Sequence, residues 1–253
     1  MATLAKRSVL VIAGLGTGQG TGASIARTFV KAGYSVALVA RGADSLEKFA
    51  AEINQSGGEA APIPVQSYSH EDISSAWARI RERYPKPNYS IRAAVFNAAS
   101  TTWKAFLDFT HQEIQDMFQS NVAAAFSFSR EAILEFKRND IQELTGKRGT
   151  LIFTGATASV RGNVTTSAFS AVKHAQRALS QSLAKEFGKE NIHVAHAIID
   201  GGINTGHASL HGRQDISVKL EPDSIAKAYL YLAEQDSSSF TWELDLRPAQ
   251  EKW

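Results

Sequence analysis

The stretch Gly14-Leu-Gly-Thr-Gly-Gln-Gly-Thr-Gly22 decides the fold class of this 253-residue chain. It follows Ser8–Ala13, an apolar run of strand length, and it opens a helical pattern over about Ala23–Ala32. Five alternating glycines permit a tight turn and a close approach of the backbone to an anion, and the first amides of the next helix face that anion. The strand, loop and helix therefore predict a phosphate-binding site within a βαβ unit.

The alternation of strands and helices continues along the rest of the chain. No linker rich in Pro, Gly or Ser divides it. Continuous apolar strands separated by helices are typical of a parallel sheet that helices cover on both faces. We therefore predict a single α/β domain over residues 1–253, built on a doubly wound sheet. The expected strands are Ser8–Ala13, Ser35–Ala40, Ala61–Val65, Ile91–Phe96, Thr150–Thr154 and His193–Ile199, and the further helices are Asp72–Arg83, Gln112–Phe136, Ser167–Phe187 and Pro222–Glu234.

Two C-terminal segments have patterns of their own. Asn204–Lys219 has weak periodicity and several Gly, His and Ser residues, and we predict a substrate lid there. Trp242, Leu244 and Leu246 alternate with polar residues, which predicts a strand with one buried face.

The composition excludes several classes of protein. The 27 Lys and Arg residues nearly balance the 25 Asp and Glu residues, and no dense basic block suggests a nucleic-acid partner. The absence of cysteine rules out disulfides, thiolate nucleophiles and cysteine zinc sites, and no metal-binding spacing occurs. The polar N-terminus leads into one short apolar stretch that ends in glycines, unlike a signal peptide or a membrane span. We expect a cytoplasmic protein that binds a small molecule, with no metal or membrane partner.

The glycines fit a longer pattern, G-x-x-x-G-x-G, in two ways. Gly14 with Gly18-Gln-Gly20 satisfies it from the strand side, and Gly16 with Gly20-Thr-Gly22 satisfies it from the helix side. In this pattern the chain resembles the short-chain dehydrogenases/reductases, whose fold is a Rossmann-like sheet that binds NAD(P). The loop is about two residues longer than is usual in that family, and which glycine takes which role stays open.

Further motifs extend the resemblance over nearly the whole chain. Asn97-Ala-Ala99 matches the family's N-A-G motif, and Asn121 matches the asparagine of its catalytic tetrad. Asp200–Thr205 lies where the family has P-G-x-x-x-T, with Asp200 in place of proline. The ending L-D-L-R-P and an F-x-x-x-K motif resemble a divergent subgroup. The resemblance implies cofactor contacts at Gly14, Gly16, Gly18, Gly20, Asn97, Lys173, Ile203 and Thr205.

The end of the second strand bears on the choice of cofactor. In nucleotide-binding sheets an acid at this place binds the ribose hydroxyls of NAD. Here the strand ends in Val39-Ala40-Arg41, and an arginine can pair with the 2′-phosphate of NADP. We therefore favour NADP(H) over NAD(H), with Arg41 as the phosphate ligand. Ser67 takes the place of an aspartate that usually lies near the adenine, and its hydroxyl can still accept one hydrogen bond.

The catalytic motif departs from the family pattern. The resemblance implies a tyrosine that transfers a proton, a serine that steadies the substrate oxygen, a lysine that binds the ribose, and an asparagine that holds a relay water. In this chain Y-x-x-x-K reads Phe169-Ser-Ala-Val-Lys173, and Ala156 stands where the serine usually falls. The i, i+4 spacing still puts Phe169 and Lys173 on one helix face. The candidate catalytic residues are therefore Asn121, Phe169 and Lys173, with Thr157 as the nearby hydroxyl and the lid histidines His207 and His211 as further candidates.

We expect an NADP(H)-dependent oxidoreductase for a small carbonyl, alcohol or activated double bond, with Phe169 in place of the proton donor. A non-redox catalyst of cyclisation or isomerisation and a nucleotide-binding module without turnover are the alternatives, because fold alone cannot choose among them. The resemblance also implies a homodimer or homotetramer joined through Gln112–Phe136 and Ser167–Phe187. The nearly apolar run Val122–Phe126 suits a helix that is buried on more than one side.

Overall fold

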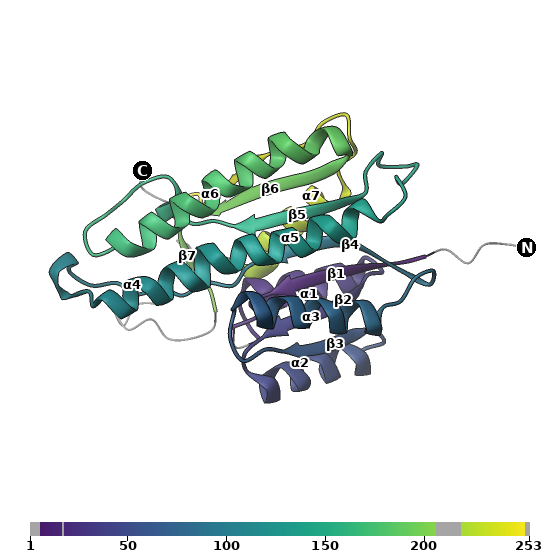
Figure 1. Ribbon diagram of the computed structural model, residues 1–253, viewed down its shortest axis with the longest axis horizontal. Helices are drawn as coiled ribbons and strands as arrows, with labels where there is room; N and C mark the ends of the chain where they lie inside the picture. Colours follow the sequence, from purple (N-terminus) through teal and green to yellow (C-terminus); the bar gives the residue numbers. More distant parts are fainter. Residues whose placement is uncertain (1–5, 17, 206–218, 251–253) are drawn as a thin grey trace, which may run out of the picture.

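A seven-stranded sheet crosses the molecule in the order β3-β2-β1-β4-β5-β6-β9 (Figure 1). The structure is a computed structural model, and it describes residues 6–16, 18–205 and 219–250. Each neighbouring pair of strands in this sheet is parallel, which confirms the predicted fold class. The strands are β1 Arg7–Ala13, β2 Ser35–Ala40, β3 Ala60–Pro64, β4 Tyr89–Phe96, β5 Gly149–Thr154, β6 Ile192–Ile199 and β9 Glu243–Leu246.

Helices cover both faces of the sheet. Helices α3, α5 and α6 bury their apolar sides on one face, and α1, α2 and α7 bury theirs on the other. Sequence analysis missed α2, although Leu46, Phe49, Ala50 and Ile53 have helical spacing and are all buried. The helices are α1 Thr21–Lys31, α2 Ala43–Gln55, α3 His70–Arg83, α4 His111–Phe118, α5 Ala124–Lys137, α6 Ser167–Phe187 and α7 Pro222–Glu234.

The predicted helix Gln112–Phe136 is interrupted near its start. Helix α4 passes into a π-helical turn, Gln119–Ala123, before α5 continues to Lys137. Such π turns are often found at functional sites. Here the wider turn contains Asn121, which is fully buried.

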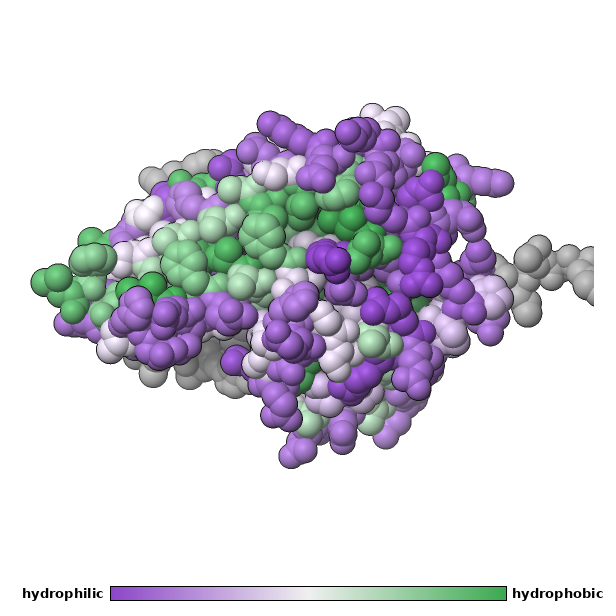
Figure 2. Space-filling model, viewed as in Figure 1, coloured by the Kyte–Doolittle hydropathy of each residue, from purple (hydrophilic) through white to green (hydrophobic). Residues whose placement is uncertain are grey.

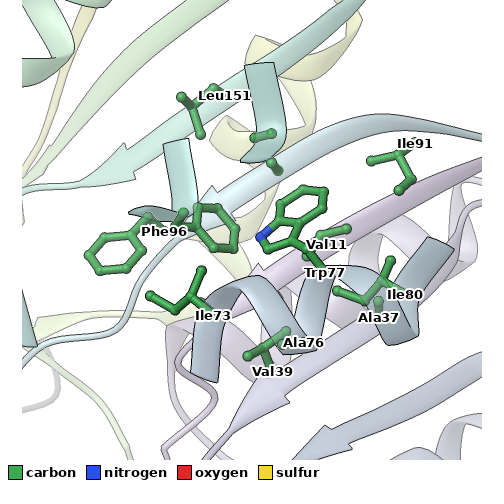
Figure 3. Close-up of a cluster of buried hydrophobic side chains, with 14 of the residues drawn as sticks. Val11, Ala37, Val39, Ile73, Ala76, Trp77, Ile80, Ile91, Phe96 and Leu151 are labelled. Atoms are coloured by element: carbon green, nitrogen blue, oxygen red, sulfur yellow. The ribbon is translucent and has the colours of Figure 1, made fainter. Parts of the chain in front are cut away.

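The core on the α3 side anchors the end of the sheet that carries the candidate site. Trp77 points from α3 toward the side chains of Val11 and Phe96 on the strands (Figure 3). Phe128 of α5 contacts both aromatic rings, at 5.4 Å from the Trp77 centroid and 5.5 Å from that of Phe96. This packing holds the last residue of β4 directly before Asn97.

Two short strands, β7 Gly202–Ile203 and β8 Lys219–Leu220, pair in a second sheet. Of the predicted lid, residues 206–218 lie outside the described part of the chain. The predicted C-terminal strand is present as β9, with Leu244 and Leu246 packed against the core. Within the described residues, no helix is both long enough and apolar enough to cross a membrane.

Candidate functional site

The glycine loop joins the end of β1 to the start of α1. Gly14, Gly16 and Gly18 have φ values of 92°, 60° and 86°, in the left-handed region that glycine adopts without strain. Gly20 is the N-cap of α1, and the first turn of the helix contains no acidic side chain. The helix therefore presents its positive end at the end of the loop, and the Asp223 carboxylate approaches its first turn by accepting the Ser24 hydroxyl at 2.6 Å.

Gly14 and Gly22 allow three elements to meet closely. A Cβ atom on Gly14 would lie 2.4 Å from the amide nitrogen of Ala98, and one on Gly22 would lie 2.2 Å from the carbonyl oxygen of Gly14. The side-chain amide of Asn97 donates to that same oxygen at 2.6 Å. The strand-side glycine is thus Gly14, and the glycine packed beneath it in the helix is Gly22. Sequence analysis did not include Gly22 among the site residues.

A pocket of about 360 Å³ opens between the glycine loop, the end of β2 and helix α2. Arg41 lies at its wall with its guanidinium carbon 5.5 Å from the ring centroid of Tyr68. Among the described residues that line the pocket, none is acidic. The wall consists of Gly14, Leu15, Gly16, Gly18, Ala40, Arg41, Gly42, Ser45, Leu46, Phe49, Tyr68, Asn97, Ala98 and Ala99.

Five of the ten sequence-predicted cofactor residues do not line this pocket: Gly20, Ser67, Lys173, Ile203 and Thr205. Ser67 turns its hydroxyl to Asp72, donating to Oδ2 at 2.7 Å, and the next residue, Tyr68, lines the wall instead. Gly20 lies on the helix side of the loop, where a Cβ atom would be 3.9 Å from the Thr205 methyl group. Thr205 itself borders a neighbouring hollow with Gly18 and Asp223. Ile203 packs against the core from strand β7.

A buried chain of hydrogen bonds runs from the pocket to the catalytic motif. The wall segment Asn97–Ala99 continues to Ser100, whose carbonyl accepts the Asn121 amide at 3.0 Å. The carbonyl oxygen of Asn121 accepts the Gln176 side-chain amide at 3.3 Å. The Gln176 side-chain oxygen in turn accepts the Lys173 ammonium at 3.0 Å. Sequence analysis missed Gln176, although it follows Lys173 by three residues and thus shares its helix face.

Lys173 is the one described cation in this chain of contacts, and it is almost wholly buried. Its ammonium also donates to the carbonyl oxygen of Thr154 at 2.8 Å. Burial in a poorly solvated environment lowers the pKa of Lys173 to about 8. The folded protein therefore holds this amine much closer to its neutral form than an exposed lysine.

The two positions that sequence analysis compared with the family's tyrosine and serine lie in one apolar cluster. Phe169 packs with Met117 and Val172, and the partly buried Ala156 and Val122 complete the contact. The Lys173 ammonium lies 5.9 Å from the centroid of the Phe169 ring. The structure thus brings Phe169, Ala156 and Lys173 together.

Thr157 turns toward a buried carboxylate. Its hydroxyl donates to Asp200, which is 1% exposed at the end of β6. Arg161 and Arg247 contact the same carboxylate at 3.5 and 3.1 Å. The Thr157 proton is therefore directed to Asp200 in this structure. Asp200 therefore links Thr157, in the loop after β5, to Arg247, in the segment after β9.

The candidate histidines of the lid, His207 and His211, lie outside the described residues. No group of three or more His, Cys, Asp or Glu side chains that could hold a metal ion occurs in the described parts of the chain. In the parts of the chain that the structure describes, the candidate site thus consists of the backbone of the glycine loop and an apolar cluster around Phe169.

Comparisons with known proteins agree with the observed fold. Residues 8–215 match the family model described as short chain dehydrogenase. The chain is 26% identical over 250 residues to the human dehydrogenase/reductase SDR family member 11, covering 93% of each chain.

Two solved structures are also similar. A short-chain dehydrogenase from Rhodopseudomonas palustris is 26% identical, with a TM-score of 0.77 and coverage of 95% of this chain and 98% of the other. An alcohol dehydrogenase from the archaeon Thermococcus sibiricus, complexed with 5-hydroxy-NADP, has a TM-score of 0.81 at 22% identity and covers 98% and 99%. The chain belongs to the short-chain dehydrogenase family.

Proposed function

We propose that the protein is an NADP(H)-dependent oxidoreductase for a small, fairly apolar carbonyl, alcohol or activated double bond, and that Phe169 stands in place of the tyrosine proton donor. The observation that carries this proposal is the pocket beside the glycine loop, which has Arg41 at its wall and no acid among its described lining residues. We also assign the chain to the divergent subgroup with F-x-x-x-K, as one domain with a substrate lid over about 204–219.

The residues present fit a nicotinamide dinucleotide. The left-handed loop glycines and the positive end of α1 suit a pyrophosphate, since backbone amides can approach it closely. Phe49 and Tyr68 supply flat apolar walls for an adenosine. Lys173, Ile203 and Thr205 are the proposed contacts to the nicotinamide half. When bound, the cofactor supplies or accepts a hydride, and the chain positions it relative to the substrate.

The preference for NADP(H) rests on charge. A 2′-phosphate near Arg41 gains a charge-assisted hydrogen bond. An acidic residue at the end of β2 would repel that phosphate, but Arg41 and Gly42 follow the strand. The structural neighbour with a bound 5-hydroxy-NADP supports the same choice.

The apolar cluster around Phe169 supports an apolar substrate. Its side chains provide apolar contact area for a substrate. The side chains of Phe169 and Ala156 carry no hydrogen that could be transferred as a proton. Asn121 and Lys173 are the polar groups that we assign to the site, together with the hydroxyl of Thr157.

We further propose a homodimer or homotetramer formed through helices α4, α5 and α6. Hydrophobic residues gather in a band over these helices (Figure 2). Phe118, Phe126 and Leu134 are 43%, 56% and 44% exposed along α4 and α5. A groove of about 280 Å³ separates α5 from α6, and an apolar band of this kind is typical of a protein interface. The expected cytoplasmic location stays a prediction.

A binding titration followed by a turnover assay tests the proposed function. We expect the protein to bind NADPH more tightly than NADH, and to oxidise NADPH with one member of a carbonyl, enone and iminium panel. Conversion of a substrate without loss of NADPH would instead support the non-redox alternative. Cofactor binding without any conversion would support a nucleotide-binding module, and failure to bind either cofactor would contradict all three.

A further inference from the structure

Arg27 of helix α1 connects two walls of the nucleotide pocket. One nitrogen of its guanidinium group, Nη2, donates to the carbonyl oxygen of Gly18 at 3.2 Å. Its guanidinium carbon lies 4.6 Å from the ring centroid of Phe49 on α2. Gly18 and Phe49 are both lining residues of the pocket. The arginine therefore contacts the glycine loop and the facing helix at the same time.

The loop and α2 approach each other closely at this point. A Cβ atom on Gly18 would lie 4.0 Å from Cδ2 of Phe49. The Glu52 carboxylate lies 3.8 Å from the Arg27 guanidinium group. Because residues three positions apart share a helix face, Glu52 contacts the arginine on the same side of α2 as the Phe49 ring. The contacts of Arg27 thus span α1, the loop and α2.

The glycine loop depends on such outside contacts to keep one conformation. Three of its glycines have positive φ values, among them Gly18 at 86°, and a glycine reaches other backbone conformations at little cost. The amide of Gly18 donates to the Leu15 carbonyl at 3.4 Å, and Arg27 binds the carbonyl group of the same residue. In a trans peptide the C=O and the next N–H point in opposite directions. The Gln19 N–H is therefore turned away from the arginine.

Each of these contacts is weak by itself. The side chains of Arg27 and Glu52 are 43% and 52% exposed, so their ion pair contributes little. An exposed cation–π contact and an exposed hydrogen bond each change an equilibrium constant by about two- to fivefold. Contacts of this strength do not decide whether the domain folds, but they can decide which conformation a loop of glycines populates.

We propose that Arg27 is a positioning residue that holds the glycine loop in its phosphate-binding conformation before the cofactor binds, and that it acts equally on NADPH and NADH. The pyrophosphate is common to both cofactors, whereas the 2′-phosphate that we assign to Arg41 is present only in NADPH. The apparent affinity of a ligand falls with the fraction of protein in the binding-competent conformation. This inference rests on the proposed function, because it takes the pocket as the dinucleotide site.

The first test examines the loop in the full-length protein without cofactor. The order parameter of the Gly18 N–H is measured by ¹⁵N relaxation. We expect it to fall from roughly 0.85 in the wild type to roughly 0.6 in Arg27→Ala, as a rigid backbone becomes flexible. Lys31→Ala, at an exposed position one turn later on α1, is the matched control and should leave the value unchanged. Equal order parameters in the wild type and in Arg27→Ala would overturn the inference.

The second test is a fluorescence titration with NADPH and with NADH. Arg27→Ala should weaken the binding of both cofactors by the same factor, about fivefold. Arg27→Lys should remain weakened, because an ammonium group cannot donate to Gly18 and also lie flat on the Phe49 ring. Urea denaturation without cofactor is measured in parallel. A merely structural role would lower the stability and leave both affinities unchanged, which would contradict the inference.

The other outcomes distinguish this inference from the proposed function. If the wild type binds neither cofactor, the proposed function fails. If Arg27→Ala loses affinity for NADPH alone, Arg27 binds the 2′-phosphate directly and the inference is wrong. If Arg27→Lys binds both cofactors like the wild type, positive charge is sufficient and the inference is also wrong. In these last two cases the proposed function survives.

Discussion

The nucleotide pocket and the reaction centre are built on neighbouring strands of one sheet but differ in chemistry. The pocket is walled by glycine backbone, Arg41 and two aromatic rings, and it matches what a dinucleotide requires. The candidate reaction centre has the apolar side chains Phe169 and Ala156, and the nearby Lys173 ammonium donates to Gln176. The proposed cofactor binding and the proposed chemistry therefore depend on different segments, one around β1 to α2 and the other around β5 to α6. The residues of the candidate reaction centre can therefore change while those of the nucleotide pocket are kept.

The largest expected effect comes from restoring the missing hydroxyl groups. The double variant Phe169→Tyr with Ala156→Ser should raise single-turnover reduction of a reactive diketone by about 10²–10⁴-fold, the usual contribution of a general acid. The two changes should be non-additive because both groups act on one oxygen. NADPH oxidation is compared among the wild type, each single variant and the double variant.

NADPH affinity is the control for this prediction, and it should change little. A double variant that binds NADPH normally and stays inert would contradict the assigned positions. A wild type that already turns over like its double variant would show that another acid protonates the substrate.

The next effect concerns the buried carboxylate that joins the reaction centre to the C-terminal segment. Asp200→Ala should lower the free energy of unfolding by about 3 kcal/mol, because removal of one partner leaves Arg247 and Thr157 without their buried acceptor. Urea denaturation measures the change. Asp245→Ala is the matched control, since Asp245 also contacts Arg247 but is 39% exposed and should cost less than about 1 kcal/mol. Equal losses would contradict a special role for Asp200.

Arg41 tests the nucleotide half alone. Arg41→Ala should weaken NADPH binding by about 1.5–3 kcal/mol, the value of a hydrogen bond to a charged group, and leave NADH binding nearly unchanged. Both cofactors are titrated against both proteins by fluorescence. Arg79→Ala is the control, because Arg79 is an exposed arginine that donates to the Pro64 carbonyl and does not line the pocket. An equal loss for NADPH and NADH would remove Arg41 from the 2′-phosphate site.

The smallest effect tests the packing of the glycine loop. Gly22→Ala should destabilise the fold by about 1–3 kcal/mol, as overpacking does, because its Cβ atom would lie 2.2 Å from the Gly14 oxygen. In Gly20→Ala, two residues earlier, the Cβ atom would lie 3.9 Å from the Thr205 methyl group. This variant should therefore lose only a few tenths of the stability that Gly22→Ala loses. Thermal unfolding of both variants gives the comparison. A Gly20 variant as unstable as the Gly22 variant would show that N-capping matters more than close packing.

Local patterns in the chain were enough to predict the sheet and most of its helices. Short apolar runs separated by helical patterns predicted six parallel strands, and the alternation of Leu244 and Leu246 predicted β9. Such patterns depend on residues within a few positions of each other, so they survive without knowledge of the fold. Helix α2 carried the same kind of signal and was missed.

The register of the glycine loop needed the tertiary structure. Both registers fit the letters of the sequence, and the close contacts involve one glycine from each, with Gly14 of the strand-side register against Ala98 and Gly22 of the helix-side register against Gly14. Ser67 shows the same limit, because a shift of one residue puts Tyr68 on the pocket wall and Ser67 against Asp72.

The sequence by itself determined a dinucleotide-type βαβ unit and placed Phe169 and Lys173 one helical turn apart. The tertiary structure decided which side chains from distant segments meet. Gln176 meets Asn121 across 55 residues of chain, and Thr157 meets Asp200 across 43. Contacts of this kind depend on how helix α6 and the strand ends pack together, and no periodicity within either segment encodes the distance between them.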